Sequence, residues 1–134
     1  MCKTAVRKPF CGKREIFVMQ GIRHLIDISD LTTEEIDGIL AVAEDIMRDR
    51  AKYAHACEGK KIATLFFEPS TRTRLSFEAA MMELGGKALG FASASNSSTT
   101  KGESVMDTIR TVSAYADIIA MRHPLEGAAL AASR

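Results

Sequence analysis

The sequence predicts an α/β fold, in which a parallel sheet lies between layers of helices as a single three-layer α/β/α domain. The apolar run Ile62–Phe67 shows no alternation of apolar and polar residues, which is typical of a strand buried on both faces, and a further buried strand is expected at Asp117–Met121. Helical patterns separate the strands, and this order requires right-handed crossovers. At 134 residues the chain has room for one core.

The first helix is indicated by a capping box, in which Thr32 is followed three residues later by Glu35. Apolar residues then recur at helical spacing at Ile36, Ile39, Leu40, Ala43, Ile46 and Met47. Gly59 breaks this pattern before the first buried strand.

A second helix is expected from about Ser70 to Leu84, closed by two glycines. A short strand at Lys87–Phe91 and a polar loop at 92–102 come next. A third helix, from about Glu103 to Tyr115, has an apolar face made of Val105, Ile109 and Val112. After the third strand, Pro124 is expected in the first turn of a last helix that includes residues 125–134.

Composition favours an ordinary soluble globular protein, with 46% hydrophobic and 26% charged residues. A net charge of +1 gives no reason to expect binding to nucleic acid or a membrane surface. No apolar run approaches the roughly 20 residues of a membrane span, and the first residues do not show the pattern of a signal peptide. Three cysteines without C-x-x-C spacing indicate neither a disulfide framework nor a zinc site. We therefore expect a cytoplasmic protein.

The first twenty residues are basic, and we interpret residues 1–20 as a flexible extension. The structured pattern starts just after Met19, which is a possible true start. The folded domain is expected at residues 21–134.

The segment Glu68–Arg74, with the sequence EPSTRTR, lies between the first buried strand and the second helix. Ligands of open α/β sheets bind beyond the carboxyl ends of the strands, where a helix N-terminus attracts anions. Ser70, Thr71 and Thr73 add hydroxyls, and Arg72 adds a fork that suits phosphate. The structural alternative is that Ser70 is only an N-cap and that the arginines are solvated.

A second arginine, Arg122, follows the third strand as Arg72 follows the first. If those strands are neighbours, two cations roughly 5 Å apart repel by about 3 kcal/mol at an effective dielectric of about 20. Such a pair favours a bound dianion, and phosphate is the natural candidate. Lys101 is a further candidate, although a loop lysine is usually solvated. Glu103 suits a helix N-terminus whatever its function, and for His123 we favour a structural role.

Four segments together resemble the aspartate carbamoyltransferase catalytic chain. They are FFEPSTRTRLSFE at 66–78, SSTTKGES at 97–104, DTIR at 107–110 and MRHPLEG at 121–127. The S-T-R-T-R element is shared with ornithine carbamoyltransferases, whereas the K-G-E and M-R-H-P elements favour aspartate as the acceptor. The resemblance extends from about Leu25 to residue 134.

The resemblance implies a role for each matching residue. Carbamoyl phosphate would be held through its phosphate, with Thr73 also reaching the carbamoyl oxygen and Arg122 bridging phosphate and carbonyl. Lys101, on a loop with Ser98, would reach a neighbouring subunit's site and contact both phosphate and L-aspartate. Glu68 would link the domain to a second one, and Glu103 would help to position Arg72. The phosphate ligands implied are Ser70, Thr71, Arg72, Thr73, Ser98 and Arg122, and the catalytic residues are Arg72, Lys101 and Arg122.

In the family, the amine of aspartate attacks carbamoyl phosphate and phosphate leaves, with no metal or organic cofactor and no covalent enzyme intermediate. The resemblance implies a homotrimer with shared sites, with regulatory chains as possible partners. The family's H-P-T-Q segment and aspartate-binding domain do not occur in this sequence, so we expect an incomplete carbamoyl-phosphate-binding domain that binds without catalysing. The alternatives are an ornithine-type carbamoyltransferase and a non-catalytic phosphate-binding module.

Overall fold

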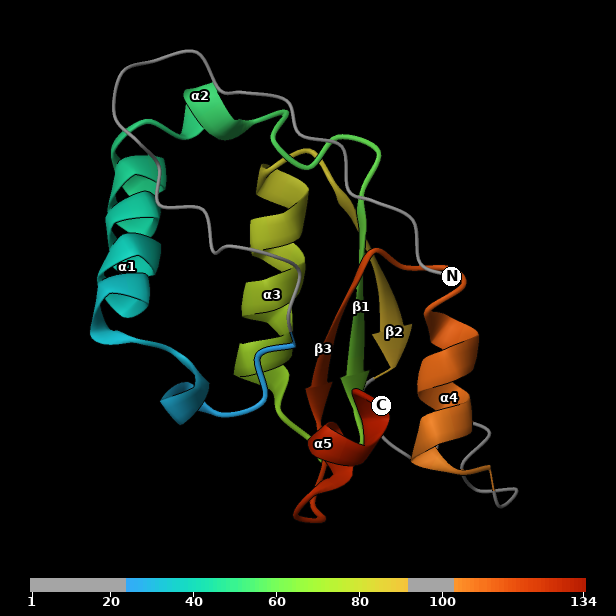
Figure 1. Ribbon diagram of the computed structural model, residues 1–134. Helices are drawn as coiled ribbons and strands as arrows, with labels where there is room; N and C mark the ends of the chain where they lie inside the picture. The colour runs from blue at the N-terminus through green and yellow to red at the C-terminus, as the bar shows by residue number, and fades with distance from the viewer. Residues whose placement is uncertain (1–23, 92–102) are drawn as a thin grey trace.

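The computed structural model describes residues 24–91 and 103–134 as a three-stranded parallel sheet with helices on both of its faces (Figure 1). The strands are β1 (Lys61–Phe66), β2 (Lys87–Phe91) and β3 (Ile118–Arg122), in the spatial order β2-β1-β3. The predicted parallel α/β fold is confirmed. The expectation that the first and third strands are neighbours is also confirmed, because β3 pairs directly with β1. Both β2 and β3 run parallel to β1.

Because β1 is the central strand, residues 62–66 are all buried, as its unbroken apolar pattern predicts. Its side chains alternate between the two faces of the sheet. Ala63, Leu65 and Phe67 form the core on one face. This core is covered by α4 (Val105–Val112), whose predicted apolar face packs against it with partly buried residues of β2 and β3.

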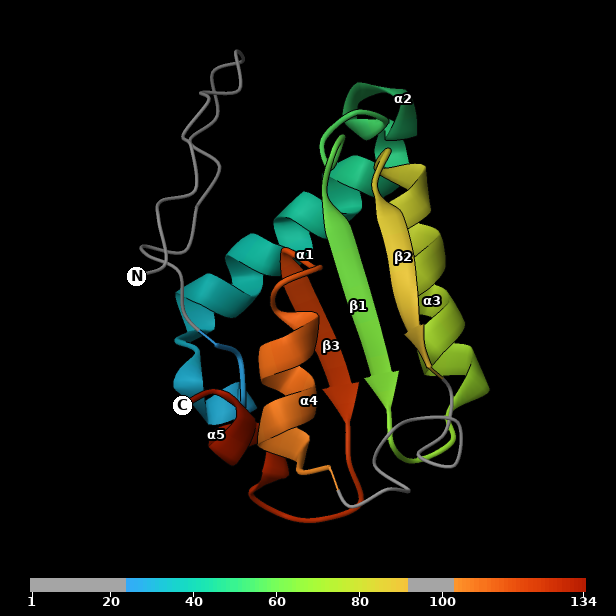
Figure 2. The same ribbon diagram turned by 90° about the vertical axis from the view of Figure 1, so that its right-hand side faces the viewer.

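The other face of the sheet is covered by α3 (Thr71–Glu83), which packs on β1 and β2. Figure 2 shows the sheet between α4 in front and α3 behind, which gives the three layers expected. The boundaries of α3 agree with the predicted 70–84, with Ser70 as its N-cap and Leu84 as its C-cap.

The first helix, α1 (Thr33–Arg48), begins with the predicted capping box. Thr32 Oγ1 accepts a hydrogen bond from the N–H of Glu35, whose carboxylate accepts one from the N–H of Thr32. However, α1 has no buried residue, so its apolar stripe is not part of the described core. The sequence patterns missed the short helices η1 (Ile28–Asp30) and α2 (Arg50–Tyr53).

Two helix starts differ from the prediction. The helix expected from Glu103 begins at Val105, because Ser104 is the N-cap and its Oγ accepts a hydrogen bond from the N–H of Asp107. Pro124 lies in a bend rather than in a helix. The last helix, α5 (Ala128–Ala132), starts only after Gly127, which has a left-handed φ of 74°.

Asp117 ties together the amino ends of β1 and β3. Its carboxylate accepts hydrogen bonds from Lys60 Nζ and from the backbone N–H of Lys61, both at 2.9 Å. The Lys60 ammonium, and next the Lys61 N–H, lower the pKa of Asp117 below its ordinary value. A carboxylate at this point therefore stabilises the pairing of the two strands.

The basic extension predicted at residues 1–20, including Met19, lies outside the described residues. Within the described ranges, no helix has the length and apolar character that crossing a bilayer requires.

Candidate anion-binding site

The carboxyl ends of β1 and β3 meet at one edge of the sheet. Phe66 and Arg122 are register partners, and the Phe67 N–H donates to the Arg122 carbonyl oxygen at 2.9 Å, so the pairing continues past the end of β1. In Figure 2 both arrows point to the end of the molecule where α3 and α4 begin. The topology therefore brings the segment after β1 and the end of β3 to the same edge.

The N-terminus of α3 offers backbone donors at this edge. The first N–H groups of a helix have no partner within the helix, and the helix dipole makes that end positive. In α3 the first intrahelical bond is donated by the N–H of Arg74 to Ser70 O, at 3.2 Å. The N–H groups of residues 71–73 thus stand at the position where an anion would be held.

Ser70 is an N-cap whose side chain makes no capping hydrogen bond. The corresponding hydroxyls of Thr32 in α1 and Ser104 in α4 do accept such bonds. Ser70 is thus the N-cap by position, as the structural alternative expects, but it makes no side-chain capping hydrogen bond, so the helix that it begins does not use its hydroxyl.

The two arginines of S-T-R-T-R differ in their surroundings. Arg74 donates from Nε to Glu78 Oε1 at 2.8 Å, and both side chains are mostly buried, with 31% and 17% exposed. Arg72 is exposed and has no ion-pair partner among the described residues. Of the two arginines Arg72 is the exposed one, and its contact with a ligand stays a prediction.

Arg122 does not stand alone at the edge of the sheet. Its Nε donates to Glu68 Oε2 at 3.1 Å, and the two side chains are 44% and 43% exposed. The sequence argument from repulsion between two unpaired cations overlooked this carboxylate. Arg122 is already partly neutralised, and an anion there would have to share it with Glu68 or displace Glu68.

Of the remaining predicted site residues, the structure describes only Glu103. Ser98 and Lys101 lie outside the described residues. Glu103 is half-buried and precedes α4, and within the described ranges no hydrogen bond or ion pair joins it to Arg72. Its role in positioning Arg72 stays a prediction.

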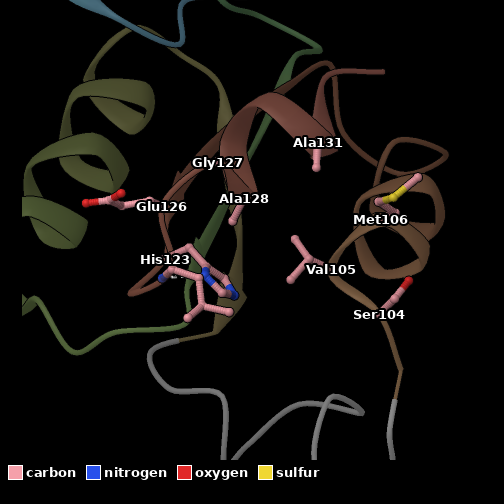
Figure 3. Close-up of a pocket in the computed structure, with 9 residues that line it drawn as sticks. Ser104, Val105, Met106, His123, Glu126, Gly127, Ala128 and Ala131 are labelled. Atoms are coloured by element: carbon pink, nitrogen blue, oxygen red, sulfur yellow. Dashed lines mark hydrogen bonds between the residues drawn. The ribbon is translucent and has the colours of Figure 1, made fainter.

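His123 has structural contacts, in line with the role favoured from the sequence. Its Nδ1 accepts a hydrogen bond from the Leu125 N–H at 3.0 Å, and its ring packs on Phe67 with centroids 4.9 Å apart. An open pocket of about 390 Å³ lies beside it, between the start of α4 and the turn that leads to α5. Figure 3 shows its lining side chains, which include His123 and Val105. The S-T-R-T-R segment and Arg122 do not line this pocket.

Comparison with known proteins points to one family. The model for "Aspartate/ornithine carbamoyltransferase, carbamoyl-P binding domain" matches residues 23–134. An aspartate carbamoyltransferase catalytic subunit from Lachnoclostridium phytofermentans is 61% identical over 112 residues, which are 84% of this chain and 36% of that protein. The subunit from Clostridium botulinum is 60% identical over 111 residues, or 83% and 36% of the two chains.

Solved structures agree. The catalytic subunit of M. jannaschii aspartate transcarbamoylase matches with a TM-score of 0.75 and 50% identity, over 84% of this chain and 37% of that one. Trypanosoma cruzi aspartate transcarbamoylase, in complex with carbamoyl phosphate and aspartate, matches with a TM-score of 0.69 and 36% identity, over 79% and 36%.

The chain spans about a third of the length of these relatives. The family match covers most of the chain, and the solved structures share the fold of the matched region. The chain belongs to the aspartate/ornithine carbamoyltransferase family and carries its carbamoyl-phosphate-binding domain.

Proposed function

We propose that this chain binds carbamoyl phosphate, or phosphate alone, at the edge of the sheet where β1 and β3 end. The observation that carries the proposal is the start of α3. There the Ser70 side chain makes no capping hydrogen bond, so its hydroxyl and the N–H groups of residues 71–73 are left to bind a ligand. Arg122 lies at the end of β3, the strand next to β1. A helix N-terminus flanked by an arginine is suited to a phosphate dianion.

In this proposal the N–H and hydroxyl groups of residues 70–73 and the Arg72 guanidinium hold the phosphate oxygens. Thr73 also contacts the carbamoyl oxygen, and Arg122 bridges phosphate and carbonyl after leaving Glu68. Charge-assisted hydrogen bonds of this kind contribute about 1.5–3 kcal/mol each. The geometry at β3 supports the role of Arg122, because the end of that strand is joined to the segment after β1.

We further propose that a longer protein containing this domain transfers the carbamoyl group to the amine of L-aspartate. A C–N bond forms, the C–O bond to phosphate breaks, the amine loses a proton, and N-carbamoyl-L-aspartate and phosphate are released. Positioning and charge stabilisation supply the catalysis, with no cofactor. The catalytic groups would be Arg72, Arg122 and Lys101, in a pathway of pyrimidine biosynthesis.

The proposed assembly is a cytoplasmic homotrimer with shared sites. In it Ser98 and Lys101 would enter a neighbouring subunit's site, where Lys101 contacts phosphate and aspartate. Regulatory chains are possible partners. Glu68 would close onto arginines of a second domain, after the binding of phosphate has taken Arg122 away from it.

The aspartate acceptor is favoured over ornithine by two observations. The M-R-H-P element at 121–124 and the K-G-E element at 101–103 are present, and the two curated relatives described above are both aspartate carbamoyltransferase catalytic subunits. Assay of a longer gene product with aspartate and with ornithine would decide between the two acceptors. A product that transfers to neither would favour the non-catalytic binding module.

A phosphate titration of the 134-residue chain, followed through its backbone amide resonances, tests the binding site. The resonances of residues 71–73 should shift with phosphate, and Arg72→Ala should raise the Kd about 10- to 150-fold. The control is Arg50→Ala, which removes the same charge from an exposed residue of α2 that pairs with Glu83. Equal Kd values for the two variants would contradict the proposal.

A second experiment concerns the chemistry of the chain as it stands. Incubation with carbamoyl phosphate and aspartate should yield no N-carbamoyl-aspartate, because the acceptor would be held by a domain that is not part of these 134 residues. Product formation by the purified chain above the rate without protein would show that this half-site suffices.

A further inference from the structure

The face that α3 turns to the sheet is unusual in its chemistry. Arg74, Glu78 and Met81 are spaced i, i+4 and i+7, so they share one helix face, and Met81 is buried at 7% exposure. Leu75 and Phe77 remain 53% and 45% exposed. The helix therefore directs an ion pair toward the sheet and leaves large apolar side chains at the surface.

The ion pair is joined to the central strand. Glu78 Oε1 accepts from Arg74 Nε at 2.8 Å and from Thr64 Oγ1 at 2.7 Å. Thr64 is 0% exposed and lies in the middle of β1. One carboxylate oxygen thus connects the first turn of α3 to the strand beneath it.

The neighbouring strand is shaped to admit this threonine. Gly90 of β2 is its register partner, and a Cβ at Gly90 would lie 2.1 Å from Thr64 O and 2.7 Å from Thr64 Oγ1. A side chain there would push Thr64 out of place. The missing side chain of Gly90 therefore leaves the room that the Thr64 carbonyl and hydroxyl occupy.

Hydrophobic packing alone does not explain this arrangement. A partly buried ion pair is often no more stabilising than apolar side chains of the same volume, and the apolar residues Leu75 and Phe77 lie one and three positions from Arg74 on the same helix. What a hydrogen-bonded network adds is direction, because hydrogen bonds weaken steeply when their distance and angle depart from the preferred range, and this favours one rotation of the helix about its axis. Arg72, two residues before Arg74, is then held about 200° around the helix from it, away from the sheet.

We propose that Thr64, Glu78 and Arg74 are positioning residues, which set the rotation of α3 so that residues 70–73 present their donors to the anion. This inference rests on the proposed phosphate site. It divides the two arginines of S-T-R-T-R by role, with Arg72 contacting the ligand and Arg74 anchoring the helix that carries it.

The test uses two substitutions at one buried position of the 134-residue chain. Thr64→Val keeps the shape and removes the hydroxyl, whereas Thr64→Ser keeps the hydroxyl and removes a methyl group. In Thr64→Val we expect the amide resonances of residues 71–73 to move without ligand and the Kd for inorganic phosphate to rise about 2- to 10-fold, equivalent to losing one hydrogen bond. Thr64→Ser should restore both readouts to those of the wild type.

The opposite pattern, in which Ser disturbs the site and Val does not, would show that Thr64 acts only by packing and would overturn the proposal. So would a Thr64→Val chain with a lower unfolding midpoint and an unchanged phosphate Kd. If Thr64→Val does not fold, Arg74→Lys replaces it, because lysine keeps the charge and loses the planar fork. Its Kd should exceed that of the matched Arg50→Lys control, and equal values would overturn the network's role.

Failure of the underlying site is separable from failure of the network. If the amide resonances of residues 71–73 in the wild-type chain do not shift when phosphate is added, the proposed phosphate site is refuted. The unliganded resonances of the two Thr64 variants would still decide whether the network sets the position of the helix.

Discussion

The ion pair between Glu68 and Arg122 makes a quantitative prediction about phosphate affinity. If Arg122 binds phosphate, the contact with Glu68 at 3.1 Å opposes binding, because the guanidinium must leave the carboxylate or share it. Both side chains are more than two fifths exposed, so the pair is screened by solvent and is worth about 0.2–1 kcal/mol. Glu68→Gln removes this competition and should lower the phosphate Kd about 1.4- to 5-fold.

The assay is a phosphate titration of both chains at equal, fixed ionic strength, followed by amide resonances. Glu83→Gln is the matched control, since Glu83 also pairs with an exposed arginine, Arg50, but at the other end of α3. Its Kd should equal that of the wild type. Raising the salt should shrink the difference between Glu68→Gln and wild type, because exposed charges are screened within about 10 Å at 0.1 M.

Two results would refute the reasoning. An unchanged Kd in Glu68→Gln would mean that Arg122 does not contact the anion or that Glu68 does not compete for it. A raised Kd would mean that Glu68 orients Arg122 for binding instead of occupying it.

Three further expectations concern stability and assembly. Gly90→Ala should lower the free energy of unfolding by about 2–6 kcal/mol, because the new Cβ would lie 2.1 Å from a backbone oxygen of β1. Gly59→Ala should lower it by only about 1–2 kcal/mol, because Gly59 has a φ of +76° but open space around the new Cβ. Chemical denaturation measures both values. Because the pKa of Asp117 is lowered in the folded chain, the contribution of its carboxylate to folding stability is fully present above the ordinary pKa of about 4. This contribution is lost as the pH falls below that value. Asp117→Asn should therefore be less stable than wild type at pH 7, and the gap should close in denaturation curves taken below pH 4. In a full-length protein that carries this domain, mixing inactive Lys101→Ala and Arg72→Ala subunits should restore part of the activity, because one mixed site would hold both native residues. If mass measurements show subunit exchange and no activity returns, the site is not shared between subunits.

Local patterns in the sequence were enough to predict most elements of the fold. The capping box at Thr32 and Glu35, the buried strand at 62–67 and the S-T-R-T-R start of α3 each depend on residues within a few positions of one another. The start of α4 was misplaced because Glu103 and Ser104 both suit a helix N-terminus, and only the backbone geometry shows that Ser104 is the cap.

The sequence also determined that two arginines follow two parallel strands, which predicted a shared edge. What the sequence could not determine is which partner each charged group takes. Glu68 and Arg122 are 54 positions apart, and Thr64 and Glu78 are 14 apart, so no local spacing pairs them. Only the strand order β2-β1-β3 and the packing of α3 on β1 bring these groups within hydrogen-bond distance. Hydrogen bonds and ion pairs act over a few ångströms, and in a folded chain that distance is set by tertiary contacts and not by separation along the sequence.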